Sequence, residues 1–367
     1  MNVLNVTTMV GIRGGDMQMY TVYNLLREYE DVKQFILCPE TSDLAKMCER
    51  DHAQYYTYKK NKLKVLNTVS AIIKICRKEK IDILHIHDST ALTYALMALK
   101  FLPSSIKLVL SRKRNNRIKD KFLNRYKYSH PRIVKIVSVS KAVEAIFGNI
   151  ISDKSKLVTI YDAIDVQKYA SKKSLNLIHE EYNLSTDTKI VGNIAGLTNQ
   201  KDIFTFVDTA KKILDKSNGL FPVKFVVAGN GVLMDDLTAY IKQLGLQNDV
   251  FLMGFRSNAA DLLPEFDVFL MTSITEGLPL TIYEAFAAKI PVVSTDAGGI
   301  REVLIHEKTG LMTAVKDTEA LSDNVIRILK DDAFKERIVQ NAYTTVTENH
   351  DLKTMKQNYY KFLKSLS

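Results

Sequence analysis

The sequence predicts an α/β protein made of two parallel-sheet domains. Short apolar runs alternate with longer amphipathic ones along its 367 residues, as strands and helices do in parallel sheets with right-handed crossovers. This length exceeds what one hydrophobic core usually supports, so we expect two domains. A content of 46% hydrophobic and 25% charged residues is that of an ordinary globular protein and gives no indication of disorder.

The expected strands of the first half lie at residues 2–9, 33–38, 82–87, 106–110, 133–139 and 156–161, with helices between them, for example at 61–80 and 89–101. The second half repeats the scheme, with strands at 188–194, 223–228, 249–253, 267–272 and 291–294. We place the domain boundary between Asp165 and about Leu175. The expected domains are therefore 1–168 and 169–348, followed by a helix over 349–367.

Positive charge is concentrated in the first half. Residues 1–170 hold 29 Lys+Arg against 16 Asp+Glu, a balance of +13, whereas residues 171–367 hold 22 against 25, a balance of −3. Residues 112–135 alone carry ten basic residues and one acidic residue, Asp120. This segment is typical either of a surface for anionic lipid headgroups or acceptor phosphates, with Phe122, Tyr126 and Tyr128 at the interface, or of a plain solvated face. No recognisable nucleic-acid module accompanies the charge, so nucleic acid is not an expected partner.

Three features indicate a cytosolic protein. The three cysteines, Cys38, Cys48 and Cys76, are odd in number and lack metal-ligand spacing, which suits a reducing compartment. The N-terminus reads as a strand without the basic start or cleavage site of a signal peptide. The longest apolar stretch, 91–102, is interrupted by Lys100 and is too short to span a bilayer. Peripheral attachment to the inner face of the cell membrane, through residues 112–135, remains compatible with these features.

The segment from Ser273 to Ala287 carries the strongest functional signal. It places Glu276 on a loop and Glu284 one turn into a helix, directly after the apolar strand at 267–272. Open α/β sheets bind ligands at the carboxyl ends of their strands. Gly277 lets the backbone approach a ligand closely, and a proline at 279 suits a helix start, so the amides of residues 277–281 can point at an anion. The pattern predicts a site for a sugar and a phosphate.

These motifs resemble the retaining nucleotide-sugar glycosyltransferases of family 4. Glu276 and Glu284 stand where that family has its paired glutamates, and the next loop, with Gly298, Gly299 and Glu302, matches as well. The resemblance covers nearly the whole chain and is strongest over 188–312. It implies the GT-B fold, in which two Rossmann-like domains face a central cleft and a C-terminal helix crosses back to the first domain.

The resemblance also implies roles for the residues of the donor site. Glu284 would bind the ribose hydroxyls, and Glu276 would hold the donor sugar near the reacting carbon. The loop and helix start at Gly277, Leu278, Leu280 and Thr281 would hold sugar hydroxyls and phosphate oxygens. Lys201 would neutralise the diphosphate leaving group, because it lies in a strand-loop-helix context. A lysine at a helix start, taken by itself, is more often a solvent-exposed charge.

Four further residues are assigned in the same way. Gly15, after the first strand, would approach the donor phosphates, although paired glycines alone indicate only a tight turn. His87, at the carboxyl end of a strand, would approach the sugar and acceptor, whereas His85 is better explained as a hydrogen-bonded core residue. Phe255 and Arg256 are expected near the nucleotide base.

The chain departs from the family pattern at two places. Gly196 stands where an arginine, a second phosphate clamp, is common, and Asp162-Ala163 replaces the usual Asn-Gly pair. Asp165 does match, and for it we expect a capping or hinge role rather than chemistry.

The resulting functional hypothesis is a retaining glycosyltransferase that moves a sugar from a nucleoside diphosphate sugar to a glycan or lipid-linked acceptor, in cell-surface polysaccharide or lipopolysaccharide biosynthesis. No metal or other cofactor is expected, and the sequence contains no Asp-x-Asp pair. One alternative is a non-catalytic GT-B partner protein that binds nucleotide sugar without turnover, which the departures at 162, 163 and 196 would favour. Another is a hydrolysing or epimerising enzyme, which would need no acceptor.

Overall fold

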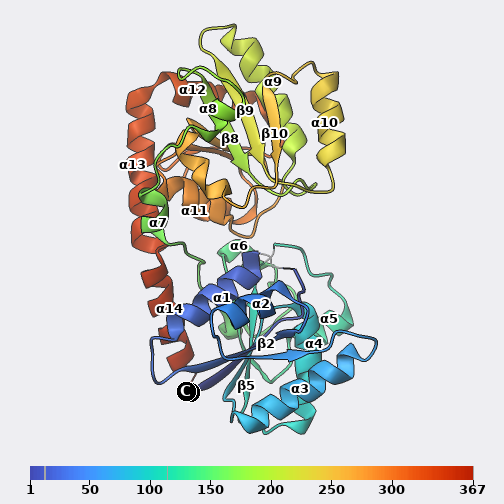
Figure 1. The fold of residues 1–367 in the computed structure, drawn as a ribbon. Helices are drawn as coiled ribbons and strands as arrows, with labels where there is room; N and C mark the ends of the chain where they lie inside the picture. The colour runs from blue at the N-terminus through green and yellow to red at the C-terminus, as the bar shows by residue number, and fades with distance from the viewer. Residues whose placement is uncertain (12–13, 114, 367) are drawn as a thin grey trace. The chain divides into compact units, whose positions relative to one another are not determined.

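The computed structural model describes residues 1–11, 14–113 and 115–366. The chain forms two compact units, each containing one parallel sheet (Figure 1). Unit 1 consists of Met1–Asp162 together with the C-terminal segment from Lys353 onward, and unit 2 is Ala163–Leu352. The prediction of an α/β chain with two parallel-sheet domains is confirmed.

Unit 1 is built on a sheet of seven parallel strands in the order β3-β2-β1-β4-β5-β6-β7. The strands are β1 (Asn2–Val6), β2 (Lys33–Pro39), β3 (Tyr55–Tyr58), β4 (Ile83–Ile86), β5 (Lys107–Arg112), β6 (Ile133–Ser138) and β7 (Leu157–Thr159). In the centre, Leu4 of β1 pairs with Phe35 of β2 on one side and with Leu84 of β4 on the other. The winding direction therefore reverses between β1 and β4.

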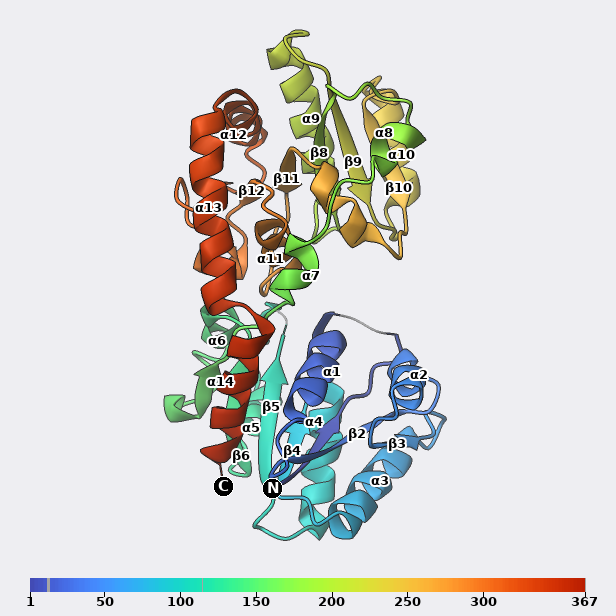
Figure 2. The same ribbon diagram turned by 60° about the vertical axis from the view of Figure 1, so that its left-hand side comes forward.

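Helices cover both faces of this sheet (Figure 2). They are α1 (Gly14–Leu26), α2 (Asp43–Arg50), α3 (Lys64–Lys78), α4 (Ser89–Ala98), α5 (Phe122–Tyr128), α6 (Lys141–Ala145) and α14 (Leu352–Lys364), with short 3-10 helices η1 (Leu99–Phe101) and η2 (Lys154–Lys156). Alternate residues of β2 point to opposite faces. Phe35 and Leu37 pack with α3 and α4, whereas Ile36 and Cys38 pack with α1 and α2.

Unit 2 contains a six-stranded parallel sheet in the order β10-β9-β8-β11-β12-β13. The strands are β8 (Lys189–Ile194), β9 (Val223–Ala228), β10 (Val250–Gly254), β11 (Val268–Met271), β12 (Val292–Thr295) and β13 (Leu311–Thr313). The helices are α7 (Val166–Ala170), α8 (Leu177–Glu181), α9 (Ile203–Ser217), α10 (Met234–Gln243), α11 (Leu280–Ala287), α12 (Thr318–Lys330) and α13 (Asp332–Asn349), with 3-10 helices η3 (Ala259–Asp261), η4 (Leu263–Glu265) and η5 (Gly298–Glu302). Here the winding reverses between β8 and β11.

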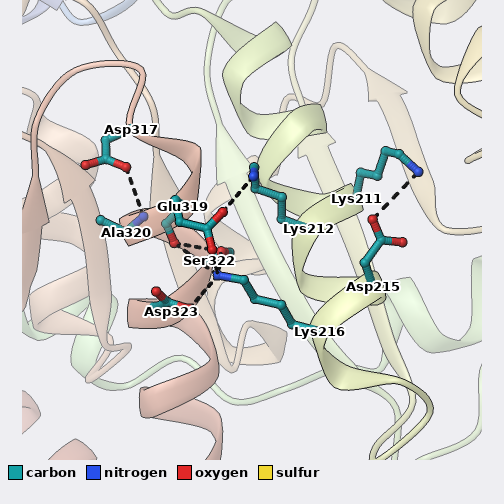
Figure 3. Close-up of polar contacts among 9 residues, drawn as sticks. All are labelled: Lys211, Lys212, Asp215, Lys216, Asp317, Glu319, Ala320, Ser322 and Asp323. Carbon is teal, nitrogen blue, oxygen red and sulfur yellow. Dashed lines mark hydrogen bonds and ion pairs between the residues drawn. The ribbon is translucent and has the colours of Figure 1, made fainter.

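An ion-pair network joins α9 to α12 on the surface of unit 2 (Figure 3). Glu319 accepts from Lys212 and from Lys216, each at 2.6 Å, and Lys216 also reaches Asp323 at 2.5 Å. These bonds, that of Lys212 first, hold the pKa of Glu319 at about 2. Because the carboxylates are exposed, the network orients two helices that already share the apolar core rather than supplying their stability.

The unit boundaries fall at Asp162 and Leu352 rather than at the expected 168 and 348. The segment after Asp165 forms helix α7, which packs on α11 and so belongs to unit 2. Asp165 caps α7 by accepting the N–H of Lys168 at 3.1 Å, the capping role expected from the sequence.

Two edge strands, β3 and β13, were not predicted. Both are only three or four residues long and lie at the edge of their sheet, where one side has no partner strand. Their apolar patterns are therefore too short and too exposed to stand out. Over the described residues, no helix is long and apolar enough to cross a bilayer.

Candidate active site

The centre of the candidate site is formed by two loops that follow β8 and β11, at the point where the sheet winding reverses. Crevices at such points are where open α/β sheets bind ligands. The loops hold each other directly. Ile274 N–H donates to the carbonyl oxygen of Gln200 at 2.8 Å, and Thr272 Oγ1 donates to that of Asp202 at 3.0 Å.

An ion pair between Lys201 and Glu276 bridges these loops. Lys201 Nζ lies 2.6 Å from Glu276 Oε1, and the two side chains are 25% and 7% exposed. The backbone of Glu276 is also anchored, because its carbonyl oxygen accepts the N–H of Gly299 at 3.1 Å. The structure thus brings together two of the residues predicted from separate motifs, and leaves the lysine within reach of solvent.

Glu284 lies in the middle of α11 and contacts a residue that the sequence analysis did not assign. Its Oε1 accepts a hydrogen bond from the Tyr169 hydroxyl at 2.9 Å. Burial raises the pKa of Glu284 above its ordinary value, although the Tyr169 bond and the Lys168 charge oppose this shift. Tyr169 was not predicted as a site residue because it lies in α7, a five-residue helix in a stretch without clear apolar periodicity.

Between the two glutamates, the chain turns into α11. Leu278 is buried, and Pro279 is the N-cap residue rather than the first helical residue, with no side-chain cap bond. Leu280 and Thr281 occupy the first two helical positions, so their N–H groups belong to those that a helix cannot use internally. This geometry is compatible with the expected contacts of residues 277–281 to an anion, and those contacts stay a prediction.

Two glycine-rich turns lie against each other at the ends of β8 and β9. A Cβ atom at Gly229 would lie 1.8 Å from the carbonyl oxygen of Ala195, and one at Gly231 would lie 2.2 Å from that of Leu197. At Gly196, by contrast, the nearest atom to an added Cβ would be 3.8 Å away. The turns need glycine at 229 and 231 for close backbone approach, whereas position 196 has room for a side chain.

Phe255 and Arg256 follow β10. Phe255 is 76% exposed, which leaves its ring available to a ligand. The Arg256 guanidinium is engaged by the carboxylate of Glu181, and its Nε donates to the carbonyl oxygen of Met253 at 3.2 Å. Their predicted placement near a nucleotide base stays a prediction.

In unit 1, His87 follows β4 and has one unpaired ring nitrogen. Its Nε2 lies 3.1 Å from Asn5 Oδ1, while Nδ1 is buried with no hydrogen-bond partner in the described part of the chain. Asn5 Nδ2 donates to Gln34, so its Oδ1 is the acceptor and His87 carries its proton on Nε2. Burial lowers the pKa of His87 well below its ordinary value. Nδ1 is therefore a neutral acceptor.

His85, expected to be a core residue, is buried and its Nε2 lies 2.8 Å from Ser111 Oγ. Burial and the nearby Lys113 charge lower its pKa to about 3. Its ring centroid lies 4.3 Å from that of His87. His85 thus helps to fix the His87 ring in place.

Gly15 lies in the first turn of α1, beside Lys113. A Cβ atom at Gly15 would lie 3.3 Å from Lys113 Cγ, so the absence of a side chain there gives the lysine room. Lys113 forms an ion pair with Asp162. Burial alone would lower the pKa of Lys113, but Asp162 and the Tyr359 hydroxyl together raise it, so the ammonium stays charged. The motif's preceding residue, Arg13, lies outside the described residues.

The basic segment 112–135 presents fewer free charges than its composition suggested. Lys113 is largely buried in its pair with Asp162, Arg125 pairs with Asp120, and the Arg132 guanidinium donates to two backbone carbonyl oxygens. Tyr128 does not lie at an interface, since it is buried against Phe147. Arg117, Lys119 and Lys121 are exposed, as are the apolar side chains of Phe122, Leu123 and Tyr126.

Groups of three or more His, Cys, Asp or Glu side chains that could hold a metal ion are absent from the residues that the structure describes. The two carboxylates predicted to form the candidate site already have partners: Glu276 pairs with Lys201, and Glu284 accepts a hydrogen bond from Tyr169.

Comparison with known proteins gives consistent results along the chain. The family model described as Glycosyltransferase Family 4 matches residues 14–168, and the one described as Glycosyl transferases group 1 matches residues 176–345. The chain is 27% identical over 292 residues to the N-acetyl-alpha-D-glucosaminyl L-malate synthase of Bacillus anthracis, covering 77% of this chain and 74% of that protein. It is 24% identical over 281 residues to the UDP-Gal:alpha-D-GlcNAc-diphosphoundecaprenol alpha-1,3-galactosyltransferase of Escherichia coli, covering 73% and 72%. Among solved structures, HepE of Anabaena in complex with UDP superposes with a TM-score of 0.85 at 19% identity, over 100% of both chains.

Proposed function

Since this chain belongs to the glycosyltransferases of family 4, with the GT-B fold, we propose that it transfers a sugar from a nucleoside diphosphate sugar to a glycan or lipid-linked acceptor with retention of the anomeric configuration. The observation that carries this proposal is the Lys201–Glu276 ion pair at the switch point of the unit 2 sheet, with Glu284 on the adjoining helix. Nearby relatives act on acceptors of different kinds, among them a diphosphoundecaprenol-linked sugar.

Donor binding would use both glutamates. The Glu284 carboxylate would accept hydrogen bonds from ribose hydroxyls, with Tyr169 fixing its orientation from the other side. Glu276 would hold the donor sugar. The amides at the start of α11 and the Lys201 ammonium would bind the diphosphate. On binding, Lys201 would exchange its ion pair with Glu276 for one with the diphosphate.

In the reaction, the bond between the anomeric carbon and the diphosphate oxygen breaks, and its electron pair leaves with the diphosphate. The acceptor oxygen bonds to the same face of the sugar, and its proton passes to a diphosphate oxygen. Stabilising the leaving diphosphate is then the main catalytic task, which falls to Lys201. No protein base is needed, and we propose that no metal is needed either. His87 would approach the sugar and acceptor, as the family resemblance implies.

A thermal-shift screen of the full chain against UDP-, GDP- and ADP-sugars tests the donor site, with Glu284→Ala as the matched variant. We expect one nucleotide to raise the midpoint of the parent and not that of the variant. Adding EDTA should leave both the shift and the turnover unchanged. Product analysis by NMR then reports the anomeric configuration. A folded parent that no nucleotide sugar stabilises would contradict the donor-site assignment.

We also propose that the enzyme associates peripherally with anionic membranes through the start of α5. Phe122, Leu123 and Tyr126 are 81%, 74% and 63% exposed, next to the exposed cations Arg117, Lys119 and Lys121. Sedimentation with vesicles of phosphatidylglycerol and phosphatidylcholine tests this proposal. We expect Phe122→Ser with Leu123→Ser to reduce binding, and the equally exposed Leu220→Ser in unit 2 to leave it unchanged. Equal binding to pure phosphatidylcholine would exclude the anionic component.

A further inference from the structure

Unit 1 contains a cavity that none of the roles above uses. It has a volume of about 200 Å³ and is lined by Thr8, Met9, Tyr58, Lys60, Lys64, Thr90 and Tyr94. The first two residues follow β1, the next two lie at or just after the end of β3, Lys64 begins α3, and the last two lie in α4. Helices α3 and α4 pack against each other (Figure 2). Because the winding of this sheet reverses between β1 and β4, the cavity lies at a position where open sheets bind ligands.

The lining contains two ammonium groups and no carboxylate. Lys60 Nζ donates to the carbonyl oxygen of Thr8 at 2.8 Å, which holds this lysine at the cavity. The ammonium group of Lys64, the exposed first residue of α3, makes no ion pair or hydrogen bond with any residue that the structure describes. The cavity therefore carries positive charge that no acid in its lining neutralises.

The neighbouring acid is Asp88, and its carboxylate is already occupied. It accepts from Thr8 N–H at 2.6 Å, from Thr8 Oγ1 at 2.9 Å, and from the N–H groups of Thr90 and Ala91 at 2.9 and 2.8 Å. Asp88 thus ties the β1 loop to the start of α4 instead of pairing with Lys60 or Lys64. Its carboxylate offsets part of the lysine charge from within the wall, but it forms no ion pair with Lys60 or Lys64.

The wall of the cavity also contains a hydroxyl group that is free to donate. The Tyr94 side chain is only 8% exposed, and across the described residues its hydroxyl makes no hydrogen bond. Tyr58, which also lines the cavity, makes a long bond of 3.5 Å to the carbonyl oxygen of Thr7. The Tyr94 hydroxyl can therefore donate a hydrogen bond to a ligand atom in the cavity.

We propose that this cavity, the Lys60–Lys64 pocket, binds a phosphate group carried by the acceptor. The proposal rests on the proposed function, since it names the chemical class of the acceptor of that reaction. Lysine is a common phosphate binder that acts as a point charge, and ammonium groups and hydroxyls can donate to a tetrahedral oxyanion from several directions. The lining contains two lysines, two tyrosines and two threonines, and no arginine.

Binding of glycerol 3-phosphate to the full chain, measured by isothermal titration calorimetry, tests the pocket. The Lys201→Ala variant serves as background, so that binding at the donor site does not contribute. In that background, we expect Lys64→Gln to weaken binding roughly tenfold and Tyr94→Phe, which removes only the hydroxyl, to weaken it roughly threefold to tenfold. Lys62→Gln is the matched control, because Lys62 is an exposed lysine of the same segment that does not line the cavity.

Several results would overturn the proposal. They are undetectable binding of the phosphate ester, binding that survives both Lys64→Gln and Tyr94→Phe, and an equal loss in Lys62→Gln, which would indicate only the general positive potential. Tighter binding of malonate with the same dependence on Lys64 and Tyr94 would assign the pocket to a carboxylate instead. The donor site is scored separately by the nucleotide shift and its loss in Glu284→Ala, so failure of the pocket and failure of the proposed function are distinguishable.

Discussion

The two units each contain a lysine paired with a carboxylate after the carboxyl end of a strand, but the pairs have different surroundings. Lys113 and Asp162 in unit 1 are 11% and 7% exposed, and the Tyr359 hydroxyl of α14 adds a further bond to the lysine. Lys201 in unit 2 is 25% exposed and bridges two loops rather than core elements. The first ammonium is fully satisfied by the fold, whereas the second can exchange its carboxylate for a phosphate. Sequence motif and burial must therefore be considered together before a lysine is assigned to chemistry.

The largest effect on stability is expected from breaking the largely buried ion pair between Lys113 and Asp162. Asp162→Asn leaves the Lys113 ammonium buried without its counter-charge, and such a loss costs about 3–5 kcal/mol of unfolding free energy. Urea denaturation followed by circular dichroism measures it. Asp323→Asn, which breaks the exposed pair with Lys216, should change the midpoint little. Similar small effects of both variants would show that burial does not distinguish these pairs.

Breaking the partly exposed ion pair between Lys201 and Glu276 should instead affect catalysis. Lys201→Ala removes the cation that stabilises the leaving diphosphate, and we expect kcat/KM for the donor to fall about 10²–10³-fold, as for the loss of one preorganised electrostatic contact. The chain should remain folded, because the pair is partly solvated. Lys211→Ala, at the surface pair with Asp215 of α9, is the control and should keep its activity. An active Lys201→Ala enzyme would remove the lysine from the mechanism.

The protonation of Glu284 is expected to have a smaller effect on folding stability, and this effect depends on pH. Its folded pKa is raised above the ordinary value of 4.5, so the folded chain holds the proton to a higher pH than the unfolded chain does. Stability from this group is therefore present below pH 4.5 and is lost as the pH rises through the folded pKa. The midpoint of the parent should fall relative to that of Glu284→Gln over this window.

Nucleotide affinity should change in the opposite direction, since the ionised carboxylate accepts stronger hydrogen bonds from ribose hydroxyls. It should rise with pH across the same window in the parent and stay flat in Glu284→Gln. A difference in midpoint between parent and variant that is independent of pH would show that Glu284 is not the titrating group.

The smallest effect is expected at Tyr169. Tyr169→Phe removes one hydrogen bond to Glu284, worth about 1 kcal/mol of unfolding free energy. Loss of the donor should also raise the pKa of Glu284 further and move the pH dependence of nucleotide binding upward. Tyr240→Phe, which removes a comparable bond to Asp208 on the surface helices, should leave nucleotide binding unchanged. A Tyr169→Phe profile identical to that of the parent would exclude a positioning role.

Much of the candidate donor site could be predicted because each part is local in sequence. Glu276, Gly277 and Glu284 lie within nine consecutive residues, at a strand-to-helix turn that apolar patterning marks on both sides. Lys201 was recognisable for the same reason. The pairing of Lys201 with Glu276 could not be predicted from either motif, because it depends on β8 and β11 being adjacent in the sheet.

The parts that were missed depend on contacts distant in sequence or on weak elements. Tyr169 lies in a five-residue helix whose contact with Glu284 spans 115 positions. The Lys60–Lys64 pocket combines segments after β1 and β3 with the start of α4, and none of these carries a motif alone. In residues 112–135 the composition was read correctly, but burial and pairing of Lys113, Arg125 and Arg132 were not visible.

By itself, the sequence determined the two parallel-sheet domains, the family resemblance and the residues of the strand-to-helix turns, because apolar periodicity and turn chemistry act over short stretches of chain. Only the tertiary structure decided that the Lys113 ion pair is largely buried while that of Lys201 is partly exposed. It also decided where the unit boundaries fall. The physical reason is that burial and charge pairing are set by neighbours in space, and strand order brings those neighbours together from distant positions in the chain.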